Sequence, residues 1–549
     1  MTGAGERNTS LWLDVAAFLF VAALIQLVVG SYNHLAGVDE IYHRLAARSW
    51  LSDGTLAVGN GAYARAAGYT ILLALVQSVL GDSLAVARGL STVFGLMWAA
   101  TLFLWLRTVG GRVVAWIAAL LLVADPEFID LSHTIRFYTL HGFLFLLGSV
   151  GWYTVVTRRF SFTGALALTS GSVAALAAAI HFQLTTIIGL AALGIWTAIE
   201  LGPACVARAR ADRRVAIAFG VAVLASVAVA VAASDWLGAL VELYWGYYRG
   251  VVVWAMGNQN NILFYNDYFM ERYPLFWALF PVAALVAVRR DRKFGIFCGS
   301  VFIAAFVLQS FGGMKGGRYI YYVIPFFFAV WAMGLNAMVA PVRALVSGAT
   351  ASLLGERASA RWLRAGRIGC YTAIGAFLIA GTPALRITVK MARDWPLSRL
   401  QVSTGWRDDG ALLRSLMAKA DVVLTPDGQQ ALYYLGRADY LVAVMKVDES
   451  NSGAEFGIDR RTGLPAISTP ESFQLVMSCY ASGLFIASRS NWRHRYGGAT
   501  DAVADLIQSK AREIPFPPKS GLRVFAWKHA GWSGPPPACA DLPALATPR

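Results

Sequence analysis

The fold is decided near the N-terminus, where residues 11–30 read LWLDVAAFLFVAALIQLVVG and residues 37–54 read GVDEIYHRLAARSWLSDG. The first stretch contains a single charged residue and is long enough to cross the hydrocarbon layer of a bilayer, which takes about 17–25 helical residues. Its apolar part is longer than that of a cleavable signal peptide, and no small-residue cleavage site follows it. These residues predict a retained membrane span followed by a polar loop that carries two adjacent carboxylates.

The composition extends this interpretation to most of the chain. Of 549 residues, 57% are hydrophobic and 14% are charged, whereas about 25% are charged in an average soluble domain. Single cores stop growing at about 250–300 residues, so this apolar excess does not fit one soluble core. Disorder, a disulfide scaffold, a coiled coil and an ordinary cytosolic enzyme are excluded. The net charge of +15 is expected to face lipid headgroups, and no nucleic-acid partner is expected.

Apolar runs predict eleven membrane spans before residue 386. They are Leu11–Gly30, Leu84–Leu106, Val113–Ala124, Thr134–Val156, Phe162–Ile180, Leu184–Leu201, Val215–Ala233, Pro274–Val288, Phe294–Phe311, Tyr319–Ala340 and Ile368–Leu385.

The run Gly68–Leu80 is apolar but short, which favours a re-entrant or interfacial helix. If it does not span, the cytoplasmic loops hold more than twice as many basic residues as the outer loops before residue 386, as the positive-inside rule requires. This topology places the N-terminus in the cytoplasm and the C-terminus outside. We therefore expect a multi-pass protein of the plasma (inner) membrane whose C-terminal part is extracytoplasmic or periplasmic.

The sequence predicts two domains. Residues 1–385 form the membrane domain, and its three outer loops of interest are 31–67, 125–133 and 234–273. Residues 386–549 form an extracytoplasmic α/β domain, because strand-like and helix-like segments alternate there. The fold class is a polytopic α-helical membrane protein with a C-terminal α/β domain. Cys479 and Cys539 can pair if this region lies outside the cytoplasm.

The acidic residues of the predicted outer loops are few and clustered. Asp39 and Glu40 lie in the first loop beside His43, and Glu40 can pair with Arg44 one helical turn later. Asp39 can instead be the N-cap of that helix, a purely structural role. The length of the loop and its two adjacent carboxylates favour a function.

The second loop, Asp125–Asp130, is also acidic and leads to Arg136 at the start of the next span. An arginine at a helix end can simply reach the membrane surface, but a buried one needs an anion such as a lipid phosphate. The stretch Gly312–Tyr319 offers two more cations, Lys315 and Arg318, although it can also be a flexible loop. The loop 234–273 is rich in aromatic and amide residues, which suits either sugar binding or an interfacial aromatic belt.

Four stretches of the sequence, in their order along the chain, resemble the GT-C glycosyltransferases, specifically the branch of protein mannosyltransferases and aminoarabinose transferases. The resemblance covers about residues 10–340. Its segments are Asp39-Glu40, Gly81–Arg88 (GDSLAVAR), Ser132–Leu140 (SHTIRFYTL) and Lys315–Tyr319 (KGGRY). The W-W-D-Y-G motif of the oligosaccharyltransferase branch is absent, so transfer of a whole oligosaccharide to asparagine is not expected.

The resemblance implies a sugar donor linked to a polyprenyl phosphate and a cell-envelope acceptor, a lipid, glycan or protein, at the outer face of the membrane. Asp39 matches the position of the family's catalytic acid. The positions that match its phosphate-facing residues are Arg136, Lys315 and Arg318. His43, Tyr138 and Tyr319 are further candidates within the same stretches.

The chemistry requires such residues independently of the family. A hydroxyl that attacks an anomeric carbon needs a base, which contributes about 10²–10⁴-fold, and a departing phosphate needs fixed cations. We expect Asp39 to be the base, with Glu40 orienting it or helping to bind a metal. The second-tier acids are Asp125, Glu127 and Asp130. A requirement for a divalent cation, Mg or Mn, stays open, and Asp39, His43 and Asp125 are its candidate ligands.

Two other functions compete with a glycosyltransferase. A transporter or lipid-sugar flippase would show internal repeats or paired broken helices, and neither is visible in the sequence. A receptor or assembly scaffold would use the outer domain to bind a partner. Within that domain, Tyr433–Arg437 and Arg460–Gly463 can contact an acceptor or can be ordinary helix and turn residues.

Overall fold

The fold was analysed in a computed structural model of the chain. Apart from isolated residues between them, the described ranges are 3–30, 35–212, 261–313, 315–337, 381–394, 405–444, 455–494, 497–530 and 532–542. The chain divides into two compact units. The helical unit comprises residues 1–31, 91–133 and 137–395, and the sheet unit comprises residues 32–90, 134–136 and 396–549.

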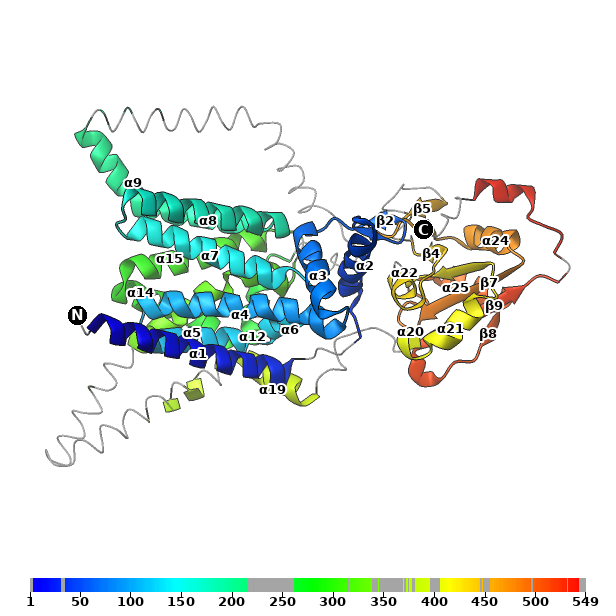
Figure 1. The fold of residues 1–549 in the computed structure, drawn as a ribbon, viewed down its shortest axis with the longest axis horizontal. Coiled ribbons are helices and arrows are strands. Elements are labelled where there is room, and N and C mark those ends of the chain that lie inside the picture. The colour runs from blue at the N-terminus through cyan, green and yellow to red at the C-terminus, as the bar shows by residue number, and fades with distance from the viewer. Residues whose placement is uncertain are drawn as a thin grey trace. The chain divides into compact units, whose positions relative to one another are not determined.

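Among the described residues, seven helices are long and apolar enough to cross a membrane. They are Leu11–Val29 within α1 (Gly3–Val29), α4 (Leu84–Val109), α7 (Tyr138–Thr157), α8 (Phe162–Phe182), Thr186–Arg208 within α9 (Thr186–Ala211), α15 (Arg292–Ser310) and the segment Gly317–Ala337. In the helical unit α7 packs along α8, and α9 packs along α15 (Figure 1). Each of these helices corresponds to a predicted span.

The other predicted spans are not confirmed as such. The run predicted at Val113–Ala124 is the 12-residue helix α5 (Arg112–Val123), shorter than a span. The run at Pro274–Val288 is divided into α13 (Pro274–Ala278) and α14 (Phe280–Arg290). Val215–Ala233 and Ile368–Leu385 lie mostly outside the described residues, as does much of the loop 234–273.

Three further helices belong to predicted loops or loop ends of the helical unit. The acidic second loop forms α6 (Pro126–Ser132), and the end of the loop 234–273 forms α12 (Phe264–Arg272). The amphipathic helix α19 (Pro383–Asp394) follows the last predicted span.

The sheet unit contains the first polar loop together with the C-terminal residues. The loop folds into α2 (Val38–Asp53), the short hairpin β1 (Ala57–Val58) and β2 (Gly61–Ala62), and α3 (Ala67–Leu80). The 14 residues of α3 match the short apolar helix that was predicted there. The sequence predicted a boundary at residue 386, with this loop on the membrane side of it, whereas the compact unit unites the loop with residues after 396.

A seven-stranded mixed sheet forms the centre of the C-terminal residues, with the order β5-β6-β4-β3-β7-β9-β8. The inner pairs β6-β4, β4-β3 and β3-β7 are parallel, while β5, β9 and β8 pair antiparallel with their neighbours. The strands are β3 (Val422–Thr425), β4 (Tyr440–Val442), β5 (Phe456–Ile458), β6 (Pro465–Ile467), β7 (Ser482–Ser488), β8 (Arg512–Ile514) and β9 (Leu522–Lys528).

Helices cover both faces of this sheet, as Figure 1 shows. Val423 belongs to the core with α21 (Gly410–Met417), while Val422 and Leu424 belong to the core with α24 (Pro470–Cys479) and α25 (Asp501–Lys510). Alternate residues of a strand point to opposite faces, which explains this division. The predicted α/β character of the C-terminal residues is confirmed, although the strands β5, β6 and β8 were not predicted.

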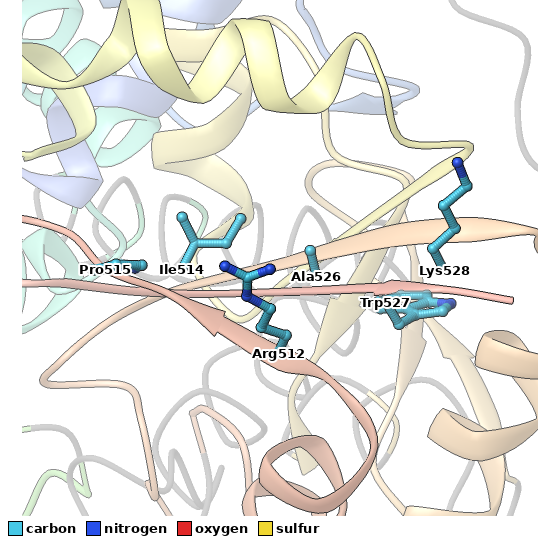
Figure 2. A pocket seen from close by; sticks show the side chains of 6 residues that line it. All are labelled: Arg512, Ile514, Pro515, Ala526, Trp527 and Lys528. Atoms are coloured by element: carbon cyan, nitrogen blue, oxygen red, sulfur yellow. The ribbon is translucent and has the colours of Figure 1, made fainter. Parts of the chain in front are cut away.

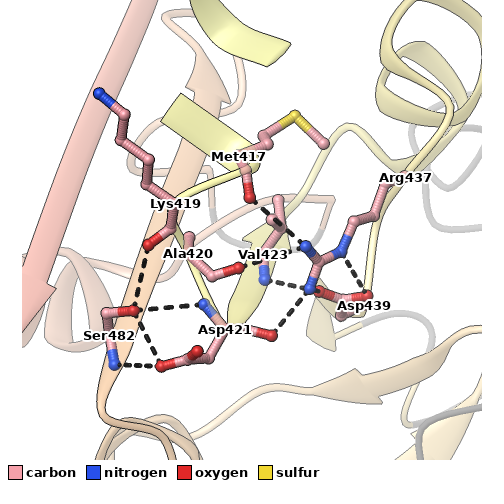
Figure 3. Close-up of polar contacts among 8 residues, drawn as sticks. All are labelled: Met417, Lys419, Ala420, Asp421, Val423, Arg437, Asp439 and Ser482. Carbon is pink, nitrogen blue, oxygen red and sulfur yellow. Dashed lines mark hydrogen bonds and ion pairs between the residues drawn. The ribbon is translucent and has the colours of Figure 1, made fainter. Parts of the chain in front are cut away.

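Two contacts hold a central strand and a covering helix of the sheet unit in place. Arg437, which follows the π-helical turn Ala431–Leu435, donates to the carbonyl of Asp421 (2.7 Å) and pairs with Asp439 (2.7 Å), as Figure 3 shows. Arg437 therefore holds the start of β3 in place, the structural alternative considered for this residue. A disulfide joins Cys479 at the end of α24 to Cys539, so the possible pairing of these cysteines is confirmed.

Candidate functional site

The start of α2 explains how its two adjacent carboxylates differ. Gly37 is the N-cap, with extended backbone angles, so Asp39 occupies the second helical position and Glu40 the third. The carboxylate of Glu40 reaches back and accepts a hydrogen bond from the Gly37 N–H at 2.7 Å, as in a capping box. The suggestion that Asp39 is the N-cap is therefore wrong, and its side chain is released from that role.

Glu40 is a buried structural carboxylate. Its Oε1 accepts from Arg88 Nε (2.9 Å) and from the Ile135 N–H (2.9 Å), and its Oε2 accepts from Arg88 Nη2 (2.7 Å). Both side chains of this ion pair are 3% exposed. Together with Gly37, four donors surround its two oxygens, so Glu40 ties the start of α2 to α4 and to the segment Thr134–Arg136.

The predicted pairing of Glu40 with Arg44 is wrong, because both carboxylate oxygens of Glu40 face other donors. Arg44 instead pairs with Asp82 and donates to the hydroxyl of Tyr433. Asp82 also pairs with Arg48 at 2.6 Å. These contacts bind the middle of α2 to the turn before α4 and to the C-terminal residues of the same unit.

Asp39 has a different environment. Its carboxylate is 2.9 Å from Arg136 Nη1; the Asp39 side chain is 43% exposed, whereas that of Arg136 is 2% exposed. The anion that a buried Arg136 was expected to need is thus, in the first place, a neighbouring carboxylate of the protein. The pair presents one accessible carboxylate, oriented by a buried cation, which is the arrangement that a general base requires.

His43 lies one turn after Asp39 and is fully buried. Its Nδ1 is 2.8 Å from the hydroxyl of Thr70, and its ring centre lies 5.1 and 5.2 Å from the ring centres of Tyr63 and Tyr69 in T-shaped contacts. Burial, followed by the nearby Arg136, lowers the pKa of His43 well below its usual value, and Asp39 opposes this shift. The imidazole is therefore neutral at physiological pH and packs within the unit.

The second loop uses its first acid structurally. Asp125 is the N-cap of α6 and accepts from the N–H groups of Glu127 (3.0 Å) and Phe128 (3.3 Å). It also accepts from the hydroxyls of Tyr321 (2.7 Å) and Tyr273. Burial raises the pKa of Asp125, while these hydrogen bonds oppose the rise.

The other two acidic residues of this loop are more exposed to solvent than Asp125. Glu127 pairs with Arg272 at 3.1 Å, and the guanidinium of Arg272 lies 4.4 Å from the centre of the Tyr268 ring. Asp130 is half-buried in the last turns of α6. These contacts are sufficient to explain Glu127 as part of the packing between α6 and α12.

Among the described residues, no three His, Cys, Asp or Glu side chains gather in a way that could hold a metal ion. The set proposed from the sequence, Asp39, His43 and Asp125, does not suit one. The ring of His43 is packed against Thr70 and aromatic edges, and the oxygens of Asp125 already face four donors. We therefore derive no step through a metal.

In the helical unit the structure brings three predicted residues together. The guanidinium of Arg318 lies 5.8 Å from the ring centre of Tyr138 and 5.1 Å from that of Tyr319, and it donates to the Tyr319 hydroxyl at 3.3 Å. Lys315 is buried, and its Nζ donates to the carbonyl of Gly312 at 2.5 Å. Burial lowers the pKa of Lys315. The predicted residues Asp39, Glu40, His43 and Arg136 thus belong to the sheet unit, and the other predicted residues belong to the helical unit.

Two residues in the sheet unit were given no definite role in the sequence analysis. Arg88 stood in the quoted stretch Gly81–Arg88, and an arginine at the start of an apolar helix is a signal for a buried partner. Arg461, in the turn between β5 and β6, lies with its guanidinium 5.3 Å from the ring centre of Tyr42. It stood in a stretch for which acceptor contact and a plain turn were both open.

A separate hollow of about 460 Å³ lies along the edge strand β8 and its neighbour β9 (Figure 2). None of the site residues predicted from the sequence lines it. The lining residues are Arg512, Ile514, Pro515, Ala526, Trp527 and Lys528.

Comparisons with known proteins identify the fold. No family model matches the chain, and no curated protein matches it by sequence. The crystal structure of ArnT from Cupriavidus metallidurans bound to undecaprenyl phosphate is similar to it, with a TM-score of 0.58 and 17% identity, covering 95% of this chain and 99% of that one. The apo state of the same ArnT gives a TM-score of 0.56 with 16% identity, covering 94% and 98% of the two chains.

The archaeal oligosaccharyltransferase AglB from Archaeoglobus fulgidus, in complex with an inhibitory peptide and a dolichol-phosphate, gives a TM-score of 0.55 with 12% identity. The match covers 95% of this chain and 75% of AglB. Identities this low establish the fold alone. ArnT and AglB are both GT-C enzymes, so the predicted GT-C-like fold is confirmed, and the chain is a multi-pass membrane protein.

Proposed function

We propose that this protein is a membrane glycosyltransferase that moves a sugar from a polyprenyl-phosphate donor to a hydroxyl group of a cell-envelope acceptor. The observation that carries the proposal is the contrast between Asp39 and Glu40 on a GT-C fold. Glu40 is enclosed by four donors, whereas the carboxylate of Asp39 is 43% exposed and held at 2.9 Å by the buried Arg136. Asp39 is thus oriented and also accessible to a substrate.

Asp39 acts as the general base in this proposal. The acceptor hydroxyl attacks the anomeric carbon of the sugar, and its proton passes to the Asp39 carboxylate. The new bond joins the acceptor oxygen to the anomeric carbon, the bond from that carbon to the phosphate oxygen breaks, and the polyprenyl phosphate leaves with the electron pair. Such a base contributes about 10²–10⁴-fold to the rate.

The departing phosphate needs cations. We propose Arg136, Lys315 and Arg318 for this task, on the basis of the motifs that contain them. Support comes from the solved ArnT structure of the same fold, which is bound to undecaprenyl phosphate. Fixed guanidinium groups stabilise developing phosphate charge without reorganising during the reaction.

We further propose that the C-terminal residues and the loop carrying Asp39 lie outside the cytoplasm of a bacterial cell. The disulfide between Cys479 and Cys539 supports this orientation, because such bonds persist in oxidising compartments. The distribution of basic residues in the sequence supports the same topology.

A turnover assay tests the proposal. The purified full-length protein is incubated with a polyprenyl-phosphate sugar and a cell-envelope extract, and transfer of labelled sugar is compared between wild type, Asp39→Asn and Asp505→Asn. Asp505 is an appropriate control because it is also an exposed aspartate paired with an arginine, Arg493. Asp39→Asn is expected to lower the rate by about 10²-fold or more, and Asp505→Asn to leave it unchanged.

Two results would reject the proposal. Equal rates for Asp39→Asn and wild type would remove Asp39 as the base. Movement of the lipid-linked sugar across vesicles of purified protein, without cleavage of the sugar-phosphate bond, would instead identify a transporter or flippase.

A further inference from the structure

The backbone between Lys315 and Arg318 is held by a tyrosine of α12. Gly316 lies between the two cations, and the hydroxyl of Tyr265 is bonded to both of its backbone groups. This hydroxyl accepts from the Gly316 N–H at 3.4 Å and donates to the Gly316 carbonyl at 3.3 Å. Tyr265 is fully buried, which fixes the position of its hydroxyl. One side chain of α12 therefore fastens the residue that follows Lys315.

The next residue of this loop packs against a second tyrosine of α12. A Cβ atom added to Gly317 would lie 2.8 Å from the hydroxyl oxygen and from Cε2 of the buried Tyr268. An alanine here would therefore force the loop or the ring to move. Tyr265 and Tyr268 are three residues apart, so they lie on the same face of α12. This face is the one that meets the two glycines.

The same face of α12 is anchored to the second acidic loop. Arg272 follows Tyr268 by four residues, and its guanidinium lies 4.4 Å from the centre of that ring. Arg272 also pairs with Glu127 of α6 at 3.1 Å, and the next residue, Tyr273, donates to the carboxylate of Asp125. The position of α12, and with it that of its two tyrosines, is thus fixed by the acidic residues of α6 and its N-cap.

The chain after Arg318 is tied to the same carboxylate. Tyr321 follows Arg318 by three residues, and its hydroxyl donates to Asp125 at 2.7 Å. The chain is therefore held on both sides of Arg318, at Gly316 and at Tyr321. Between these two points the guanidinium of Arg318 lies 5.8 Å from the ring centre of Tyr138.

Two adjacent glycines make such support necessary. Glycine loses more conformational freedom on folding than any other residue, so a loop with two glycines between its cations samples many conformations unless contacts restrain it. Cations stabilise a departing phosphate efficiently only when they are in position before the reaction. A site on a loop obtains this precision from the residues that surround the loop.

We propose that Tyr265 is a positioning residue for Lys315 and Arg318, which it serves by fixing the backbone at Gly316. This inference rests on the proposed function, in which the two cations stabilise the phosphate of the donor. It also gives the second acidic loop a task, because that loop anchors the helix that carries Tyr265.

The test measures binding of undecaprenyl phosphate to the full-length protein in lipid nanodiscs. Tyr265→Phe removes the hydroxyl and keeps the buried ring. Tyr322→Phe is the matched control, because Tyr322 is also buried and its hydroxyl also donates to a backbone carbonyl at 3.3 Å, that of Thr185. Thermal unfolding of each variant without ligand verifies that it is folded.

A second pair of variants changes the loop itself. Gly317→Ala places a methyl group against Tyr268 and displaces the loop without altering α12, whereas a Cβ atom at Gly299 in α15 meets no described atom within 4 Å. Gly299→Ala is therefore the control for Gly317→Ala. This pair keeps the inference testable if Tyr265→Phe does not fold.

Tyr265→Phe is expected to weaken binding by about tenfold, the combined effect of two lost hydrogen bonds on the loop. Gly317→Ala should weaken binding at least as much, and the two controls should remain within about twofold of wild type. In an Arg318→Gln background, Tyr265→Phe should cost clearly less than in wild type, because one of the side chains that it positions is gone.

The outcomes separate this inference from the proposed function. Equal binding by wild type and folded Tyr265→Phe, or by wild type and Gly317→Ala if Tyr265→Phe is unfolded, overturns the inference and leaves the proposed function intact. An equal loss in Tyr322→Phe, or a loss of the same size in the Arg318→Gln background, also overturns it. A wild-type protein that does not bind undecaprenyl phosphate contradicts the proposed donor, whatever the variants do.

Discussion

The buried pair of Glu40 and Arg88 allows the sharpest test of how the loop carrying Asp39 is held. Both side chains are 3% exposed and are joined by two hydrogen bonds, at 2.9 and 2.7 Å. In Glu40→Gln the carboxylate charge is removed while the shape is kept. The guanidinium of Arg88 is then left buried without its counter-charge, and two of the four donors around residue 40 meet an N–H₂ group instead of an oxygen.

The expected loss of stability in Glu40→Gln follows from the burial of this ion pair. Removing one partner of a buried ion pair costs about 3–5 kcal/mol, because the remaining charge is uncompensated. Glu513→Gln is the matched control: Arg523 also contacts both oxygens of Glu513, at 2.9 and 2.7 Å, but the side chain of Glu513 is 47% exposed. Exposed pairs are worth about 0–1 kcal/mol, so this variant should change little.

Native-state hydrogen exchange, read by mass spectrometry on the protein in detergent, measures the local opening free energy. Peptides that cover α2 should exchange about a hundredfold faster or more in Glu40→Gln than in wild type, since about 1.4 kcal/mol corresponds to a factor of ten. Peptides from α25 serve as an internal reference and should be unchanged.

The double variant Glu40→Gln/Arg88→Met decides the interpretation. If the cost comes from an uncompensated charge, removing Arg88 as well should restore roughly half of the lost protection. If the double variant exchanges as fast as the two single effects added together, the two residues act independently. The role assigned to the pair would then be wrong.

Three further predictions concern the sheet unit. Cys539→Ser should lower the free energy of unfolding of the C-terminal residues by about 4 kcal/mol, the value that the chain-entropy model gives for the 60-residue separation from Cys479. An unchanged midpoint of denaturation in guanidinium would contradict this prediction. Gly463→Ala should be much more destabilising than Gly436→Ala, because both glycines have a positive φ but, of the two, only Gly463 contacts the β1-β2 hairpin. Equal melting temperatures of the two variants would refute this contact. Burial lowers the pKa of His43 in the folded state, so the unfolded state binds more protons below about pH 6.5. The free energy of unfolding should therefore fall as the pH drops from 7.5 to 5.5, and His43→Asn should weaken this dependence.

Much of the helical unit could be predicted because a bilayer demands long apolar helices. The first span was expected to end at Gly30, and α1 ends at Val29. The predicted span at Pro274–Val288 failed for a local reason. Pro281 lies at the start of α14 and lacks an N–H group, so the helix is interrupted near Leu279 and begins again.

The sequence allowed individual candidate residues to be selected, but it did not allow their interaction partners to be predicted. Asp39, Glu40 and Arg136 could be selected from their types and from the loops in which they occur. Their partners could not, because the ion pair of Glu40 joins it to Arg88, 48 residues away, and local helix spacing suggested Arg44 instead. Long-range pairing depends on the packing of whole elements, which single-residue patterns do not contain.

The role of the C-terminal residues follows from the side chains they share with the first loop. Within the sheet unit, the buried Tyr42 accepts from Gln429, and the buried Arg44 donates to Tyr433. Without the C-terminal residues, Tyr42 would lose the Gln429 donor and Arg44 would lose the Tyr433 hydroxyl while keeping Asp82. A buried polar group left unsatisfied costs about 1–3 kcal/mol. The helix that carries Asp39 is therefore stabilised by the C-terminal residues as well as by Arg88.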